Sequence, residues 1–235
     1  MVSNGLAKSR EEANSLLMSG NVFINEKRVE KAGQQVKTDS KIEIKGKTYP
    51  WVSRGGIKLE KAILEYKLNC DLIIALDIGA STGGFTDVLL ARGAKKIYAV
   101  DVGYGQLDWR LRQNERVIVK EKTNARFLTD QIIKDPLDAI VCDASFISLK
   151  KVLPSGLSLL KTKGWLAALI KPQFEVGKGL VGKGGVVRDP ELHQEVVADI
   201  KNWLQHDMNM YLSGVVESPI LGPSGNKEFV IVANK

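Results

Sequence analysis

The sequence predicts an α/β protein: a mostly parallel sheet of seven strands with helices on both faces, preceded by a small N-terminal α+β domain. Its 235 residues are enough for one full domain and a small one. From residue 72 onward, short apolar runs alternate with helical patterns, which is typical of a buried parallel sheet. The predicted domains are residues 1–46 and 57–235, joined by a linker at 47–56.

The first domain shows a short helix and a hairpin. The segment "SREEANSLLMSG" begins with a capping box of Ser9 and Glu12, and Gly20 can end a helix there. "NVFINEKRV" predicts a hairpin that turns at Asn25 and Glu26, and "SKIEIKG" predicts another short strand.

Positive charge is concentrated near the N-terminus. Of the net charge of +7, residues 1–61 carry +5, because they hold 12 Lys and Arg against 7 Asp and Glu. A small basic segment of this kind suits a polyanionic partner such as nucleic acid, while a solvated basic surface is the alternative. Pro50 and the Gly55-Gly56 pair mark the linker, after which an amphipathic helix is expected over 57–66.

The second domain contains seven apolar runs that predict strands. In chain order they are "LIIALDIG", "KKIYAVDVG", "RVIVKEK", "LDAIVCDAS", "GWLAALIKP", "YLSGVVESP" and "KEFVIVANK". Helices are expected at "FTDVLLARG", "LDWRLRQ" and "LKKVLPSGLSLL", and from Pro190 to His206. The last two strands lie close together in sequence, so we expect them to form an antiparallel pair.

The loop after the first of these strands predicts a cofactor site. In open α/β sheets, ligands bind at the carboxyl ends of the strands. A dinucleotide site has G-x-G-x-x-G, whereas this loop has Ser81 at the middle position between Gly79 and Gly84. That pattern favours a cofactor without a pyrophosphate, such as S-adenosylmethionine. Asp101, which ends the second strand 22 residues after Gly79, could hold the ribose hydroxyls. A tight turn without a ligand is the alternative.

Composition argues against several other classes of protein. No stretch approaches the roughly 20 apolar residues of a membrane helix, and no apolar signal core follows Met1. Two cysteines, Cys70 and Cys142, show no metal-ligand spacing, so we expect no metal site and a reducing, cytoplasmic environment.

The fourth strand bears on which atom could be methylated. Its end, "AIVCDASF", lacks the Asn/Asp-Pro-Pro-aromatic motif of enzymes that methylate base amines. Methylation of a cytosine carbon needs a nucleophilic cysteine, but Cys142 lies inside an apolar strand, where burial deactivates a thiol. We interpret Cys142 as a packing residue.

Four residues from distant parts of the chain suit a hydroxyl substrate: Lys58, Asp143, Lys171 and Glu228. Each lies near the end of a predicted strand or helix, where solvated termini are also common. Methylation of a ribose hydroxyl needs a nearby base and cations that favour the developing alkoxide. Two neighbouring ammonium groups disfavour each other's charge, so one of them can accept a proton. The set predicts ribose methylation.

The chain also resembles a known family along nearly its whole length. "SRGGIKL", "LDIGASTGGFTDVLL", "AVDVGYGQL", "IVCDASFISL", "IKPQFEVGKG", "GGVVRDP" and "NKEFVIVA" are similar to segments of the TlyA (hemolysin A) family of FtsJ-like ribose 2′-O-methyltransferases. "GNVFINEKRV" resembles part of the S4-type RNA-binding module, whose first helix the sequence would enter partway.

The resemblance implies a Rossmann-like, S-adenosylmethionine-dependent methyltransferase that modifies a ribose, typically of cytidine, in ribosomal RNA or ribosomal subunits. It implies a catalytic tetrad of Lys58, Asp143, Lys171 and Glu228, with Lys171 as the base. The implied cofactor contacts are Gly79, Ser81, Gly83, Phe85, Thr86, Asp101, Asn124 (near the adenine) and Asp143.

RNA contacts are expected from basic residues in both domains. The stretch "FEVGKGLVGKGGVVRDP" has five glycines among its cations and is either a flexible surface loop or a mobile RNA clamp. Trp51 is interpreted as a core anchor rather than a base-stacking residue, and His193 and His206 as non-catalytic. The candidate RNA-binding residues are Lys8, Arg10, Lys27, Arg28, Arg54, Lys178, Lys183 and Arg188.

Two other functions are open at this stage. The family's older name suggests a membrane-active haemolysin, although no amphipathic or apolar membrane segment is visible in the sequence. The other is a non-catalytic RNA-binding protein of ribosome assembly, which the intact four-residue set argues against.

Overall fold

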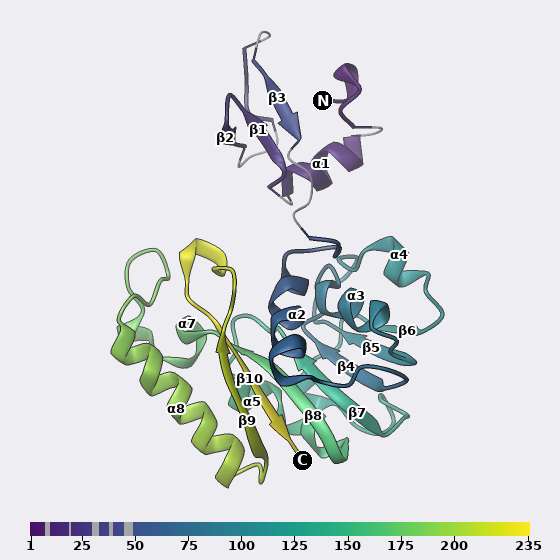
Figure 1. The fold of residues 1–235 in the computed structure, drawn as a ribbon, viewed down its shortest axis with the longest axis vertical. Coiled ribbons are helices and arrows are strands. Elements are labelled where there is room, and N and C mark those ends of the chain that lie inside the picture. The colour runs from purple at the N-terminus through teal and green to yellow at the C-terminus, as the bar shows by residue number, and fades with distance from the viewer. Residues whose placement is uncertain (8–9, 19, 30–32, 38–39, 45–48) are drawn as a thin grey trace. The chain divides into compact units, whose positions relative to one another are not determined.

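The computed structural model describes residues 1–235 except 8–9, 19, 30–32, 38–39 and 45–48 (Figure 1). The chain forms two compact units, Met1–Pro50 and Trp51–Lys235.

The N-terminal unit contains a small antiparallel sheet and one α-helix. A 3-10 helix η1 (Val2–Asn4) and helix α1 (Arg10–Met18) precede strands β1 (Val22–Ile24), β2 (Lys27–Arg28) and β3 (Ile42–Ile44), in the sheet order β2-β1-β3. Asn25 and Glu26 turn the chain between β1 and β2 with φ of 47° and 67°, which confirms the predicted hairpin. Ser9 of the predicted capping box lies outside the described residues.

The second unit is built on a seven-stranded sheet in the order β6-β5-β4-β7-β8-β10-β9. Its strands are β4 (Ile74–Ile78), β5 (Lys96–Val100), β6 (Val117–Lys120), β7 (Leu137–Cys142), β8 (Leu160–Ile170), β9 (Tyr211–Glu217) and β10 (Phe229–Asn234). Strands β4 to β8 pair in parallel, and β10 pairs antiparallel with both β8 and β9. The predicted fold class and the antiparallel terminal pair are confirmed.

Helices cover both faces of this sheet (Figure 1). On one face, α2 (Gly55–Tyr66) and α3 (Gly84–Ala91) bury residues such as Leu59 and Leu89 against the strands. On the other, α5 (Leu149–Val152), α6 (Pro154–Ser158) and α8 (Pro190–His206) bury residues such as Leu149 and Ile200. The shorter elements are α4 (Trp109–Arg112), α7 (Pro172–Glu175), η2 (Ala125–Phe127), η3 (Lys178–Leu180) and η4 (Pro223–Gly225).

The central strands explain why both faces are apolar. Along β7, Leu137, Ile140 and Cys142 pack with the α8 side of the core, while Ala139 and Val141 pack with the α2 side. Successive side chains of a strand point to opposite faces, so a continuous apolar run fills both cores. The polar residues that end these strands therefore collect along one edge of the sheet.

Two predicted helices differ from the structure. The helix expected at "LDWRLRQ" is limited to the four residues of α4, whose start is capped by the Asp108 side chain. The single helix expected at "LKKVLPSGLSLL" is two short helices, α5 and α6, because Pro154 has no N–H to continue the first and begins the second instead.

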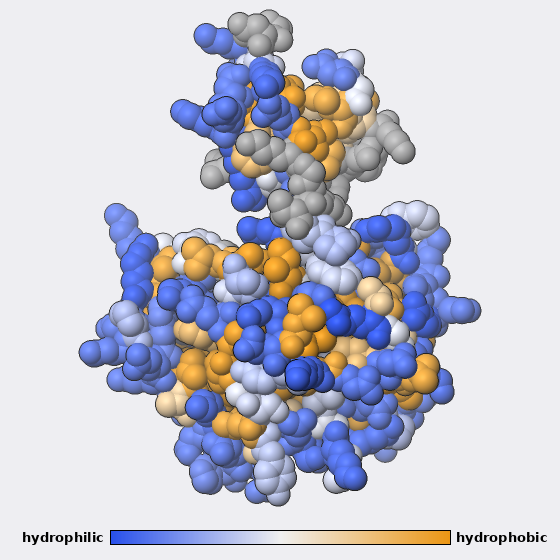
Figure 2. All heavy atoms as spheres, in the orientation of Figure 1, coloured by the Kyte–Doolittle hydropathy of each residue, from blue (hydrophilic) through white to orange (hydrophobic). Residues whose placement is uncertain are grey.

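The face of the second unit in Figure 2 is largely polar, and the two cysteines of that unit are buried. On the face shown in Figure 2, hydrophilic residues cover most of the second unit, with small apolar patches between them. Within the described ranges, no helix has both the length and the apolar character needed to cross a membrane. Cys70 and Cys142 are buried and unpaired, and burial raises the pKa of the Cys142 thiol to about 12, as expected of a packing residue.

Candidate active site

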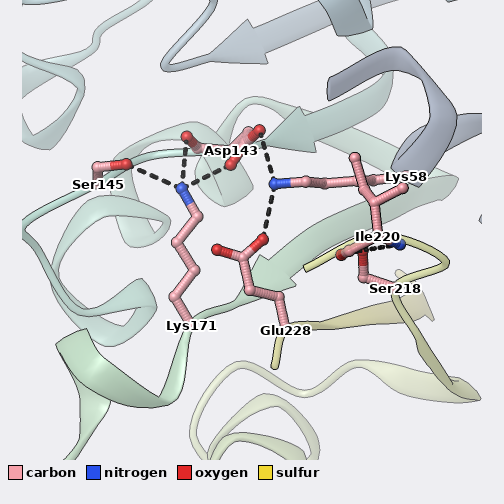
Figure 3. Close-up of polar contacts among 7 residues, drawn as sticks. All are labelled: Lys58, Asp143, Ser145, Lys171, Ser218, Ile220 and Glu228. Atoms are coloured by element: carbon pink, nitrogen blue, oxygen red, sulfur yellow. Dashed lines mark hydrogen bonds and ion pairs between the residues drawn. The ribbon is translucent and has the colours of Figure 1, made fainter. Parts of the chain in front are cut away.

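The four residues of the predicted tetrad meet at one edge of the sheet (Figure 3). Asp143 follows β7, Lys171 follows β8, Glu228 precedes β10, and Lys58 lies in the second turn of α2. Lys58 Nζ lies 2.6 Å from Glu228 Oε2 and 3.8 Å from Asp143 Oδ2, and Lys171 Nζ lies 2.6 Å from Asp143 Oδ1. Both ammonium groups therefore contact the same carboxylate.

This cluster is almost completely buried. Lys58 is 7% exposed, Lys171 5% and Glu228 1%, whereas Asp143 is partly exposed. Burying an unpaired charge is costly, and here two cations face two carboxylates, so the charges balance. Gly222 packs directly over the Glu228 carboxylate and leaves no room for a Cβ.

Lys171 has three oxygen neighbours. Its Nζ donates to the Asp143 carbonyl oxygen at 3.2 Å and to Ser145 Oγ at 2.9 Å. The close contact with Asp143 Oδ1 is an ion pair, but it is not aligned as a hydrogen bond. Ser145 was missed in the sequence, although a hydroxyl two residues after Asp143 on the same loop was a usable signal.

A pocket of about 980 Å³ opens beside this cluster, at the carboxyl ends of β4, β5 and β7. Its wall includes five of the predicted cofactor residues, namely Gly79, Ser81, Asp101, Asn124 and Asp143. Gly79 has φ of 77°, and a Cβ there would lie 2.9 Å from the Ala144 Cα, so the close approach of the two loops requires glycine.

The glycine loop is held by its own N–H groups. Ser81 N donates to Asp101 Oδ2 at 2.8 Å, and Gly103 N donates to Asp101 Oδ1 at 2.7 Å. Gly79 N and Ala80 N both donate to the Val100 carbonyl oxygen. A loop whose N–H groups are used within the protein is poorly suited to phosphate, which supports a cofactor without a pyrophosphate.

The pocket fits S-adenosylmethionine in size and chemistry. Val100, Val102 and Ile147 supply apolar surface for an adenosine, and the Asp101 carboxylate has lone pairs left for ribose hydroxyls. Asn124 Oδ1 accepts from Arg126 N at 3.1 Å, which fixes this side chain at the start of η2.

Three predicted cofactor residues lie behind the loop, outside the pocket wall. Gly83 packs against Leu107 and Leu111, and Phe85, in the first turn of α3, is buried in the core. Thr86 donates its hydroxyl to Asp77 Oδ2 at 2.6 Å. Their positions suit support of the loop rather than direct contact with a ligand.

Asp77, the last polar residue of β4, was not recognised as a site residue in the sequence. It is fully buried, and burial is the main cause that raises its pKa to about 7. The hydrogen bond from Thr86 opposes this rise, and the nearby Asp143 and Asp101 add to it. The spacing of residues in the sequence alone does not identify Thr86 on α3 as its hydrogen-bond partner.

Phe146 is a second feature that the sequence did not reveal. It is 89% exposed, has φ of 64°, and lies with its ring centroid 5.0 Å from that of Phe174. A left-handed backbone costs a bulky residue about 1–3 kcal/mol, and such strain persists where the surroundings enforce it. Both rings line the pocket beside Ser145.

The predicted RNA-binding residues are distributed over both units. In the N-terminal unit Arg10, Lys27 and Arg28 are exposed, whereas Lys8 lies outside the described residues. In the second unit, Arg54, Lys183 and Arg188 are exposed, and Lys178 begins η3.

The glycine-rich stretch is partly anchored. Gly182 and Val186 form an isolated β-bridge, and Asn226 donates to the Gly185 carbonyl oxygen while accepting from Val187 N. The buried His193 pairs its Nε2 with the Val187 carbonyl oxygen, consistent with a non-catalytic role.

Trp51 packs against the core beside α2, next to Gly56, where a Cβ would collide with the indole. This agrees with its interpretation as an anchor. Within the described part of the chain, no cluster of three or more His, Cys, Asp or Glu side chains is placed to hold a metal ion.

Comparison with known proteins places this site in a family. A model described as FtsJ-like methyltransferase matches residues 51–235, and one described as an S4 domain matches residues 1–42. The 16S/23S rRNA (cytidine-2′-O)-methyltransferase TlyA of Mycobacterium tuberculosis is 44% identical over 98% of this chain and 86% of that protein. Hemolysin A of Brachyspira hyodysenteriae is 39% identical over 97% of this chain and 95% of that protein.

A solved structure supports the same relationship. A Streptococcus thermophilus protein described as a candidate hemolysin has a TM-score of 0.80 at 40% identity, and the match covers 98% of this chain and 84% of that one. The resemblance noted in the sequence is confirmed. The chain belongs to the TlyA (hemolysin A) family of FtsJ-like methyltransferases, which use S-adenosylmethionine, and it carries an S4 domain ahead of the methyltransferase domain.

Proposed function

We propose that the protein methylates the ribose 2′-hydroxyl of a cytidine in ribosomal RNA, either free or within a ribosomal subunit. The observation that carries this proposal is the buried cluster in which Lys58 and Lys171 share the Asp143 carboxylate at the wall of the cofactor pocket. A ribose hydroxyl is a very weak acid, so its methylation requires such a base and nearby positive charge. The similarity to the Mycobacterium tuberculosis enzyme supports cytidine as the target.

The four residues divide this task. Lys171, as a neutral amine, takes the proton of the 2′-hydroxyl. Asp143 fixes Lys171 through its carbonyl and carboxylate oxygens and holds Lys58 on its other oxygen. Glu228 pairs with Lys58 and keeps it aimed at the site, where its positive charge favours the developing alkoxide.

The pocket residues hold the methyl donor in place. S-adenosylmethionine, when bound, supplies a methyl group on a positively charged sulfur. Gly79 and Ser81 would form the floor of its site, Asp101 would accept hydrogen bonds from its ribose hydroxyls, and Asn124 would contact its adenine. Gly83, Phe85 and Thr86 support that loop from its core side and would not contact the cofactor.

RNA is held by cations outside the cluster. The exposed Arg10, Lys27 and Arg28 serve the S4 domain, and Arg54, Lys183 and Arg188 serve the methyltransferase domain. Lys8 and Lys178 complete this set as predictions from the sequence. Such cations contact phosphates and position the substrate without reading its bases.

The test is incubation of purified protein with methyl-labelled S-adenosylmethionine and ribosomal subunits from cells that lack it. We expect label on a 2′-oxygen of one or a few cytidines, mapped by nuclease digestion and nucleoside analysis. Label on a base would contradict the proposal. Cofactor binding without any transfer, to subunits or free RNA, would instead indicate an RNA-binding assembly protein.

A variant pair tests the role of the base. Lys171→Ala should abolish turnover while leaving cofactor affinity nearly unchanged, because Lys171 is not part of the pocket wall. Lys61→Ala is the matched control, since this lysine is partly exposed and, among the described residues, forms its ion pair with Glu65 four residues away on α2. A collapse of cofactor affinity in Lys171→Ala would make Lys171 a binding or structural residue.

A further inference from the structure

Lys171 and the pocket are separated by one hydroxyl group. Lys171 is 5% exposed and does not line the pocket, whereas Ser145 is exposed and does. Ser145 Oγ lies 2.9 Å from Lys171 Nζ, and Figure 3 shows it on the side of the amine away from Glu228. A ribose hydroxyl that approaches the cluster from the pocket side would therefore meet Ser145 before it met the amine.

The neighbours of Lys171 differ in what they can exchange with it. The carbonyl and carboxylate oxygens of Asp143 can only accept hydrogen bonds, whereas the Ser145 hydroxyl can accept or donate. A charged Lys171 has three protons for these three oxygens. A neutral Lys171 has two protons and one lone pair: one proton serves the hydrogen bond to the Asp143 carbonyl oxygen, the other can face Asp143 Oδ1 at 2.6 Å, and the lone pair remains for Ser145.

The neutral amine that catalysis needs therefore points its lone pair toward Ser145. In the neutral amine, the Ser145 O–H donates to the Lys171 lone pair, and Ser145 Oγ turns its own lone pairs toward the pocket. Ser148, the next hydroxyl of the same loop, cannot take this part, because it donates to Glu175 Oε2 at 2.6 Å.

We propose that Ser145 is a catalytic residue that relays the proton from the substrate to Lys171. This inference rests on the proposed ribose methylation. As the new O–CH₃ bond forms, the 2′-hydroxyl proton passes to Ser145 Oγ, and the Ser145 proton passes to Lys171 Nζ. The serine ends as a hydroxyl, the lysine as an ammonium, and the methyl donor, S-adenosylmethionine, leaves as its neutral thioether, so atoms and charges balance.

Single-turnover methylation with protein in excess over unmethylated ribosomal subunits tests this role. At saturating cofactor and protein concentrations, where any change in binding is compensated, Ser145→Ala should lower the rate of 2′-O-methylation about 100-fold or more, the size usual for general acid–base groups. Ser145→Thr retains a hydroxyl and should stay within about tenfold of the wild type. Ser158→Ala removes an exposed hydroxyl of α6, outside the site, and is the control.

Solvent deuterium distinguishes a relay from simple positioning of Lys171. Two protons in transit should give the wild type a bowed dependence of rate on the deuterium fraction. The relay would be overturned by a straight dependence of rate on deuterium fraction, or by the absence of an isotope effect. It would also be overturned if Ser145→Ala lost threefold or less in rate, if Ser145→Thr lost as much as Ser145→Ala, or if weaker binding explained the loss. A wild type that labels no 2′-oxygen would refute the proposed function itself, which separates the two failures.

Discussion

Asp77 should make the second unit less stable as the pH rises toward neutrality. A carboxyl with a raised pKa keeps its proton in the folded state at pH values where the unfolded chain has lost it. The pKa of an aspartate is ordinarily 3.8, and that of Asp77 in the folded state is about 7. Between these two pH values the folded state binds more protons than the unfolded state, so the free energy of unfolding falls as pH increases. Above pH 7 the full cost is about 4 kcal/mol, at 1.36 kcal/mol per pH unit across that window.

The variant Asp77→Asn removes this titration and keeps the shape of the side chain. Its amide oxygen can still accept the hydrogen bond from Thr86. We expect the free energy of unfolding of the variant, relative to the wild type, to increase by about 4 kcal/mol between pH 4 and pH 7 and then to level off. Burial of the amide lowers the stability of the variant by an amount that does not vary with pH. The prediction therefore concerns how the difference in the free energy of unfolding changes with pH, and not its value at one pH.

Urea unfolding followed by tryptophan fluorescence measures this difference. All four tryptophans, Trp51, Trp109, Trp165 and Trp203, belong to the unit that contains Asp77, so the signal reports on that unit alone. A difference between variant and wild type that stays constant from pH 4.5 to pH 8 would refute the reasoning, because it would mean that the carboxyl ionises normally inside the fold.

Three further outcomes follow from contacts described above. Gly79→Ala should weaken cofactor binding and destabilise the fold by at least about 1 kcal/mol, because the positive φ of Gly79 and the facing loop exclude a Cβ. Calorimetry and thermal unfolding measure the two effects, and an unchanged cofactor affinity would contradict this prediction. Replacing Lys27 and Arg28 with Gln should lower the salt dependence of subunit binding by up to two phosphate contacts without changing cofactor affinity, and an unaltered slope would remove both from the interface. Glu175→Ala should cost about 1–3 kcal/mol of stability, because the Ser148 hydroxyl loses its acceptor, and Glu175→Gln should restore most of it.

The fold and the tetrad could be predicted from sequence because both depend on strand ends. Continuous apolar runs identify the buried parallel strands, and the polar residues that follow such runs must collect at one edge of the sheet. Asp143 and Lys171 end neighbouring strands, β7 and β8, so their contact follows from strand order. Lys58 and Glu228 were found as members of a chemically plausible set, which the family resemblance reinforced.

What remained hidden depends on side-chain direction rather than residue type. The hydroxyl of Ser145 reaches Lys171, while the ring of the next residue, Phe146, is exposed on a left-handed backbone. The buried Asp77 accepts a hydrogen bond from Thr86 in the first turn of α3, whose side chain points inward. Local propensity does not specify these orientations.

The reversed direction of β10 has a consequence for synthesis of the protein. The walls of the cofactor pocket come from residues 78–177, so they are all present when synthesis has passed α7. Glu228 reaches the same edge only because β10 runs against its neighbours and begins where they end. A nascent or C-terminally shortened chain could therefore acquire its methyl donor while lacking the carboxylate that pairs with Lys58, so binding competence would precede catalytic competence.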